Sequence, residues 1–248
     1  MRIITNEKYG DCPENTLDMY LPEKSGYDTI VYFHGGGLEA GDKADENCIA
    51  IGKRFAECGY GFVSVNYRMY PQAKFPEYLQ DAARAIAWVK AHAISYGGNG
   101  ELYVSGTSAG AWISIMLCLN EEYLQGVGIY PLGIKGWIID SAQMTAHFNV
   151  LKYETGVDPN LQRINEFAPL YYVDSKTKCN RMLLLFYQED IPCRPEQNML
   201  FIKAIQQFDK GIDLQYKQLK GGHCHGSSVP DEDGEYEYVK EVLRWLQC

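Results

Sequence analysis

The stretch VSGTSAGA, residues 104–111, places one serine between two glycines where strand-like residues give way to helix-like ones. It contains the pattern Gly-x-Ser-x-Gly, formed by Gly106, Ser108 and Gly110. Small residues on both sides permit the sharp, strained strand-to-helix turn that exposes a nucleophilic serine above a sheet. Because a five-residue pattern also occurs in ordinary tight turns, the rest of the chain has to decide between the two interpretations.

The composition favours one folded domain over residues 1–248. Hydrophobic residues make up 46% and charged residues 22% of the chain, which is ordinary for a globular protein. The length suits a single α/β domain. A formal net charge of -9 would repel nucleic-acid backbones and anionic lipid surfaces. We therefore expect no nucleic-acid partner, no membrane partner and a small-molecule substrate, while the oligomeric state stays open.

The first residues, MRIITNEKYG, lack the apolar core of a signal peptide. No later apolar run reaches the roughly 20 residues of a membrane span, so we expect a cytoplasmic protein. The 8 cysteines form no Cys-x-x-Cys pair, which argues against a zinc ribbon or a compact disulfide scaffold. The sequence predicts neither a metal nor another cofactor.

Strand-like and helix-like stretches alternate along the chain. Strands are expected at 16–21, 29–34, 61–67, 101–105, 136–140, 182–187 and 212–219, and helices at 43–57, after Pro76, and at 111–119, 195–208 and 236–246. This order predicts an α/β fold with a mainly parallel central sheet and helices on both faces. Ligand sites in such sheets lie at the carboxyl ends of the strands.

One long interval, about 143–180, lacks a strand and helix of the usual size. Connections this long in a compact domain usually serve a function. We expect a small cap or lid over the strand ends.

The sequence HGGG at 34–37 directly follows an expected strand. Successive glycines let backbone N–H groups approach a substrate closely, and the N–H of Ala109 at the start of the next helix could join them in an oxyanion hole. One such donor contributes about 3 kcal/mol to transition-state stabilisation. Because both motifs lie at expected strand-to-helix junctions, the sequence favours a catalytic site over a chance match to either pattern.

A serine nucleophile also needs an acid and a base. The strand around 182–187 ends at Glu189 and Asp190, and position favours Asp190 over Glu189 as the acid. The loop GGHCHG, 221–226, offers His223 and His225, and we favour His223 as the base because it directly follows the two glycines. A metal site in that loop is disfavoured because no third ligand with the usual spacing follows.

Together, HGGG, GTSAG, a late Asp and a GGH loop resemble an α/β-hydrolase of the carboxylesterase type, similar to hormone-sensitive-lipase-like and acetyl or feruloyl esterases. The motifs extend from residue 34 to 225. The resemblance implies the α/β-hydrolase fold, with Ser108 as nucleophile, His223 as base, Asp190 as acid, and an oxyanion hole from the N–H groups of Gly35, Gly36 and Ala109. Only 33 residues precede HGGG, so the large helical cap of lipase-like relatives and its deep tunnel are not expected.

We therefore expect a serine carboxylesterase for short-acyl or aromatic-acyl esters, with sugar esters among the candidates. Gly37 and Thr107 belong to the two motifs and are expected to contact substrate, as are Phe148 and His147 of the cap, although His147 could instead pack. An amidase such as an arylformamidase, or a small peptidase, would use the same residues. A catalytically silent binding protein is the alternative from another class, and it would typically have lost one of them.

Overall fold

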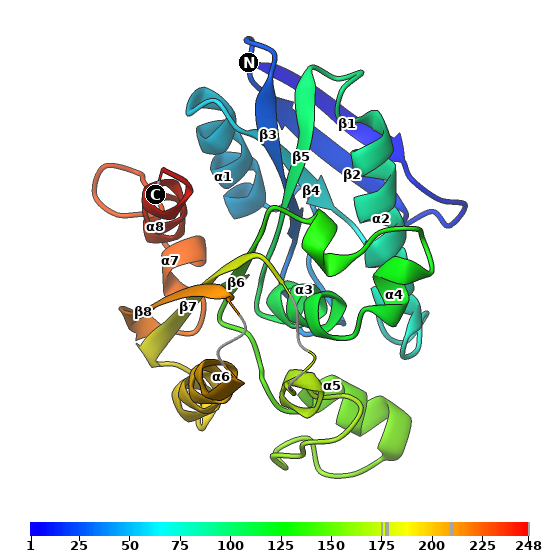
Figure 1. The fold of residues 1–248 in the computed structure, drawn as a ribbon, viewed down its shortest axis with the longest axis vertical. Helices are drawn as coiled ribbons and strands as arrows, with labels where there is room; N and C mark the ends of the chain where they lie inside the picture. Colours follow the sequence, from blue (N-terminus) through cyan, green and yellow to red (C-terminus); the bar gives the residue numbers. More distant parts are fainter. Residues whose placement is uncertain (175, 177–178, 209–210, 248) are drawn as a thin grey trace.

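A computed structural model of the chain describes residues 1–174, 176, 179–208 and 211–247. Within them, one sheet has the strand order β1-β2-β4-β3-β5-β6-β7-β8 (Figure 1). The strands are β1 (Arg2–Lys8), β2 (Thr16–Leu21), β3 (Tyr27–Phe33), β4 (Gly61–Val65), β5 (Gly98–Thr107), β6 (Gly136–Asp140), β7 (Arg181–Glu189) and β8 (Asp213–Gly222).

The sheet is mainly parallel, as expected. Only β2 runs antiparallel to its neighbours β1 and β4 among the described strands, and every pair from β4 to β8 is parallel. The carboxyl ends of β3, β5, β6, β7 and β8 therefore lie along one edge of the sheet. The strand β1 was not expected, because its largely exposed edge position leaves few apolar residues in its sequence to signal it.

Helices cover both faces of the sheet (Figure 1). On one face lie α1 (Glu46–Glu57), α7 (His225–Ser228) and α8 (Glu237–Leu246), and on the other lie α2 (Glu77–His92), α3 (Ala109–Leu119), α4 (Glu122–Gln125) and α6 (Arg194–Phe208). The pleat of β3 explains the two cores: Ile30 and Tyr32 join the cluster under α1 and α8, whereas Val31 and Phe33 join the one under α2 and α3. The fold class predicted from the sequence is confirmed.

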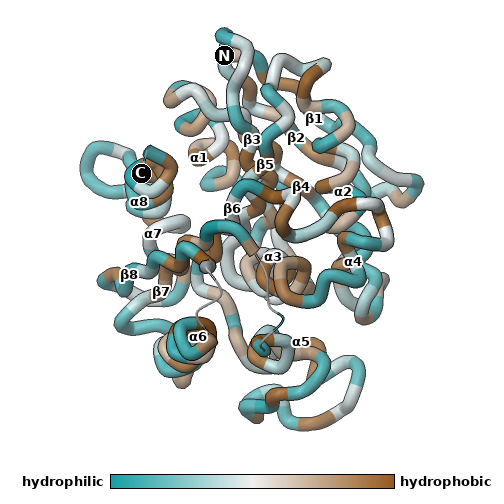
Figure 2. Tube along the Cα trace, viewed as in Figure 1, coloured by the Kyte–Doolittle hydropathy of each residue, from teal (hydrophilic) through white to brown (hydrophobic). Residues whose placement is uncertain are grey.

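Hydrophobic residues gather along the central strands, between the helical layers (Figure 2). The strand β4 is buried along its whole length, which is why it reads as a continuous apolar run. In the described part of the chain, no helix combines the length and the apolar character needed to cross a membrane.

The described residues of the long interval between β6 and β7 form only short elements: α5 (Phe148–Val150), the π-helix η2 (Leu151–Thr155) and the 3-10 helix η3 (Pro169–Tyr172). Another 3-10 helix, η1 (Pro131–Gly133), lies before β6. Rings from this interval pack on the body of the protein. Tyr153 stacks on Tyr70 with ring centroids 4.3 Å apart, and Phe167 meets Phe75 at 4.8 Å. Residues 175, 177 and 178 of the expected cap lie outside the described residues. Its role as a lid stays a prediction.

Candidate active site

Ser108 occupies the turn between β5 and α3 in a strained conformation, with φ 54° and ψ -113°. A side chain on Gly106 would lie 2.3 Å from the carbonyl carbon of Gly110, and one on Gly110 would lie 1.9 Å from the carbonyl oxygen of Phe33. Neither position can hold a Cβ atom without movement of the backbone. The two glycines of the motif are therefore what allows this turn to form, and the turn leaves Ser108 partly exposed.

A chain of hydrogen bonds joins Ser108 to two residues that are distant in sequence. The Ser108 Oγ atom lies 2.8 Å from His223 Nε2, and His223 Nδ1 lies 2.6 Å from Asp190 Oδ1. The sheet register produces this meeting, because Glu189 pairs with Gly222 and the next residues of both strands are Asp190 and His223. A proton on Nδ1 that is donated to the carboxylate leaves Nε2 free to accept the serine hydroxyl.

The side chain of Asp190 is fully buried, whereas that of His223 is 25% exposed. The backbone N–H of Ile191 donates to Asp190 Oδ1 at 2.7 Å, which fixes the carboxylate. A charge-assisted hydrogen bond in such a water-poor position is strong. Glu189 is exposed at the end of β7 and is not part of this chain of hydrogen bonds.

The glycine loop after β3 packs directly on the serine turn. A Cβ atom on Gly35 would lie 3.3 Å from that of Ser108. Gly36 has φ 107°, and its carbonyl accepts the N–H groups of Glu39 and Ala40 at 3.1 and 3.0 Å, so the loop closes tightly. Ala109 begins α3 next to the serine, where helix geometry leaves the first N–H groups without intrahelical partners. The glycine loop and the start of α3 thus both lie next to Ser108.

A second carboxylate, Asp140, lies buried beneath the serine turn at the end of β6. The Ser227 hydroxyl donates to Asp140 Oδ2 at 2.7 Å and the Thr107 hydroxyl at 3.2 Å, while Tyr32 donates to Thr107 at 2.9 Å. Burial raises the pKa of Asp140 to about 6, although the hydroxyl donors oppose that rise. No sequence motif marks this residue. Its position at the end of an apolar strand is the one signal that could have found it.

We expect Asp140→Asn to gain stability relative to the wild type as pH increases. Because the pKa of Asp140 is higher in the folded state than in the unfolded state, binding of a proton to this carboxyl stabilises the fold. This contribution is fully present below the ordinary pKa of 3.8 and is lost as pH rises through about 6. At about 1.4 kcal/mol per pKa unit, this shift corresponds to about 3 kcal/mol. Denaturant unfolding of both proteins from acid to neutral pH measures it. A stability difference that stays constant with pH would contradict this account.

A cleft of about 540 Å³ opens above Ser108. Its lining combines the glycine loop, the start of α1, and the loops after β7 and β8, and includes Tyr32, Glu39, Asp45, Asn47, Thr107, Phe148, Asn149, Ile191 and His223. None of the described lining residues is Lys or Arg. Gly37, Thr107 and Phe148 all line the cleft, and the Thr107 hydroxyl is hydrogen-bonded to Tyr32 and Asp140. Their contact with substrate stays a prediction.

His147 does not line the cleft, which corrects the expectation of a substrate contact. Its ring is buried behind Phe148, with ring centroids 4.4 Å apart, and meets the edge of Trp112 at 5.4 Å. Burial lowers the pKa of His147 well below its ordinary value, so the ring is neutral. Packing against two aromatic rings thus explains this histidine.

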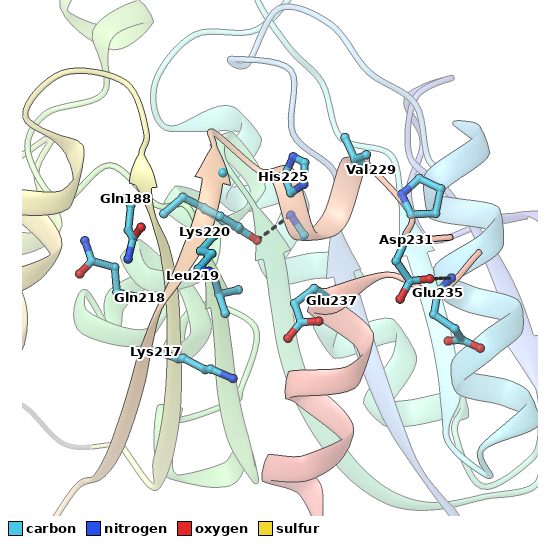
Figure 3. A pocket seen from close by; sticks show the side chains of 14 residues that line it. Gln188, Lys217, Gln218, Leu219, Lys220, His225, Val229, Asp231, Glu235 and Glu237 are labelled. Atoms are coloured by element: carbon cyan, nitrogen blue, oxygen red, sulfur yellow. Dashed lines mark hydrogen bonds between the residues drawn. The ribbon is translucent and has the colours of Figure 1, made fainter. Parts of the chain in front are cut away.

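A second hollow, also of about 540 Å³, lies beside β8, α7 and α8 (Figure 3). His225, the alternative base, lines this second hollow together with Lys220 and Glu237. This second hollow is separate from the cleft above Ser108, and His223 lies in that cleft. Among the described residues, no group of three or more His, Cys, Asp or Glu side chains is arranged to hold a metal ion.

Comparison with known proteins supports the fold class that the sequence predicts. The BD-FAE family model matches residues 17–130. The probable isoprenylcysteine alpha-carbonyl methylesterase ICMEL1 of Oryza sativa subsp. japonica is 33% identical over 145 residues, which cover 57% of this chain and 32% of the relative. The match spans only 24% to 32% of the length of this and the neighbouring plant relatives.

Solved structures match over nearly the whole chain. Esterase B of Lactobacillus rhamnosis superposes with a TM-score of 0.77 at 17% identity, covering 99% of this chain and 84% of that one. A truncated carbohydrate esterase from gut microbiota gives 0.76 at 17% identity, covering 100% and 95%. At such identities the likeness to these structures shows the fold alone. The chain has the α/β-hydrolase fold, and over part of its length it is similar in sequence to esterases.

Proposed function

We propose that the protein is a carboxylic ester hydrolase in which Ser108, His223 and Asp190 form the catalytic triad. The hydrogen-bonded chain from Ser108 Oγ through His223 to the buried Asp190 is the observation that carries this proposal. A serine hydroxyl is a weak nucleophile at neutral pH, and this arrangement supplies the base and the orienting acid that it needs.

In the proposed reaction, Ser108 Oγ attacks the ester carbonyl while His223 Nε2 accepts its proton. The N–H groups of Gly35, Gly36 and Ala109 stabilise the resulting oxyanion. His223 then returns the proton to the leaving alcohol, and an acyl group remains on Ser108. Water, deprotonated by His223, attacks this acyl-enzyme and releases the acid. Asp190 holds the imidazole in the required tautomer throughout.

The cleft supports uncharged esters of modest size. Asp45 lines it, and the lining contains no lysine or arginine among its described residues that would attract an anionic ester. Phe148 and Ile191 offer apolar surface for a short or aromatic acyl group, and Asn47 offers hydrogen bonds to hydroxyl groups. We therefore propose short-acyl or aromatic-acyl esters as substrates, with sugar esters as the alcohol part to test.

A series of p-nitrophenyl esters from acetate to decanoate tests this substrate range. Because the cleft holds only about 540 Å³, we expect kcat/KM to fall by about tenfold or more between butyrate and decanoate, as poorly accommodated methylene groups lose binding energy. Activity that increases up to decanoate would contradict the proposed range. Activity on formamides or peptides with none on esters would instead favour the amidase or peptidase alternative.

A further inference from the structure

One side chain outside the triad reaches into the glycine loop from far along the sequence. The Asn149 side-chain amide donates to the Gly37 carbonyl at 2.7 Å and to Glu39 Oε2 at 2.7 Å. Asn149 is 3% exposed. Both of its donor hydrogens are therefore engaged, and both partners belong to the loop that follows β3.

The arm that carries Asn149 is itself firmly held. The Asn149 backbone N–H donates to His147 Nδ1 at 3.2 Å, and the neutral state of that ring suits an acceptor. Two residues of the following π-helix, Lys152 and Tyr153, donate to the other oxygen of Glu39. Further along, Glu154 accepts from the hydroxyl of Tyr70 at 2.6 Å and from the N–H of Phe75 at 2.9 Å. Asn149 thus projects from a segment that is fixed to the body of the protein.

The glycine loop needs such support because its peptide groups have unusual freedom. Gly36 and Gly37 have φ of 107° and 67°, and glycine pays no steric penalty for turning a peptide over. Each of the three successive carbonyls has a distinct restraint. The Gly35 carbonyl lies 2.7 Å from His34 Nδ1, and the Gly36 carbonyl accepts two N–H groups of the loop itself. The Gly37 carbonyl is held by Asn149, which lies 112 residues further along the chain.

We propose that Asn149 is a positioning residue for the oxyanion hole: by holding the Gly37 carbonyl, it keeps the N–H groups of the glycine loop aimed at the reacting carbonyl oxygen. This inference rests on the proposed ester hydrolysis at Ser108. Asn149 does not take part in proton transfer. It acts through the loop, so its loss weakens stabilisation of the transition state more than binding of the ester.

The variants Asn149→Ala and Asn149→Asp test the inference with p-nitrophenyl acetate and a trifluoromethyl ketone that forms a tetrahedral adduct with serine. Direct removal of an oxyanion-hole donor costs about 10²–10³ in kcat, so we expect a smaller loss of about 10- to 50-fold for Asn149→Ala. KM should change by less than about threefold, and affinity for the ketone should fall by about the same factor as kcat.

Asn149→Asp keeps the shape of the side chain but places an oxygen against the Gly37 carbonyl and the Glu39 carboxylate. We expect it to lose more activity than Asn149→Ala. Lys152→Met is the matched control, since it removes an exposed ion pair of the same segment with Glu39, and a cation–π contact with Tyr153, but leaves the Asn149 hydrogen bonds in place. A surface ion pair of this kind is worth little, so its kcat should stay within about twofold of the wild type.

All rates are divided by the number of sites titrated with a fluorophosphonate, and folding is followed by circular dichroism. If Asn149 only stabilises the fold, the titrated fraction falls while kcat per site and ketone affinity stay at wild-type values, and the inference is overturned. If Asn149→Ala does not fold, the isosteric Asn149→Asp decides. If the wild type shows no ester turnover that Ser108→Ala abolishes, the proposed function itself is refuted. This outcome is distinct from failure of the Asn149 inference.

Discussion

Ser108→Ala is expected to lower kcat for p-nitrophenyl acetate by about 10⁴- to 10⁶-fold, because it removes the only nucleophile that His223 contacts in the proposed triad. The glycine loop and the start of α3 would still bind the carbonyl, so a residual rate above that of buffer should remain. Alanine also removes no packing atom except the hydroxyl, so the fold should be preserved.

The measurement is steady-state hydrolysis by the two purified proteins side by side, with labelling by a fluorophosphonate as a second readout. The wild type should be labelled at one site and the variant at none. Equal, feeble rates in both proteins, together with an unlabelled wild type, would mean that Ser108 does not act on esters. The silent binding protein would then become the better interpretation.

Asp190→Asn is expected to lower kcat by about 10⁴-fold. An asparagine amide would donate a hydrogen bond to His223 Nδ1, whereas the carboxylate accepts one. The imidazole would then carry its proton on Nε2, facing Ser108, and could not accept the serine proton. Because the carboxylate is buried and its Oδ1 lies 2.6 Å from the ring, neither the tautomer nor the geometry can be restored by solvent.

Glu189→Gln is the matched control for this experiment, since it makes the same chemical change at the preceding, exposed residue. Its kcat should remain within about twofold of the wild type, as is usual for surface substitutions without buried partners. The assignment of the acid would fall if Glu189→Gln were inactive while Asp190→Asn kept its activity.

Much of the fold could be predicted because buried strands leave a strong local signal. The strands β2 and β6 have the bounds expected from their apolar residues. Three others, β5, β7 and β8, run further than expected, since pairing in the sheet continues past the last apolar residue into polar or glycine-rich sequence. The edge strand β1 is largely exposed and lacks this signal.

The site residues also fall into two groups, those with a local sequence signal and those without one. Ser108 and the glycine loop are marked by local patterns, because their backbone shapes demand glycine. The contact of Asn149 with Gly37 spans 112 residues, and that of Asp140 with Ser227 spans 87. No local pattern records contacts of this range. The burial of His147 against Trp112 could not be predicted either, since the sequence of an irregular segment does not show whether a histidine faces solvent or the core.

The position of β8 at the far edge of the sheet has a consequence for biosynthesis. Ser108 and His223 are 115 residues apart, and His223 takes its place only when β8 pairs with β7. Contacts of such separation form late, because a long stretch of chain must first be ordered. On the ribosome, the nascent chain carries its serine and glycine loop long before the base has emerged from the exit tunnel. In the proposed mechanism, a growing chain thus cannot hydrolyse esters until β8 has emerged and paired with β7.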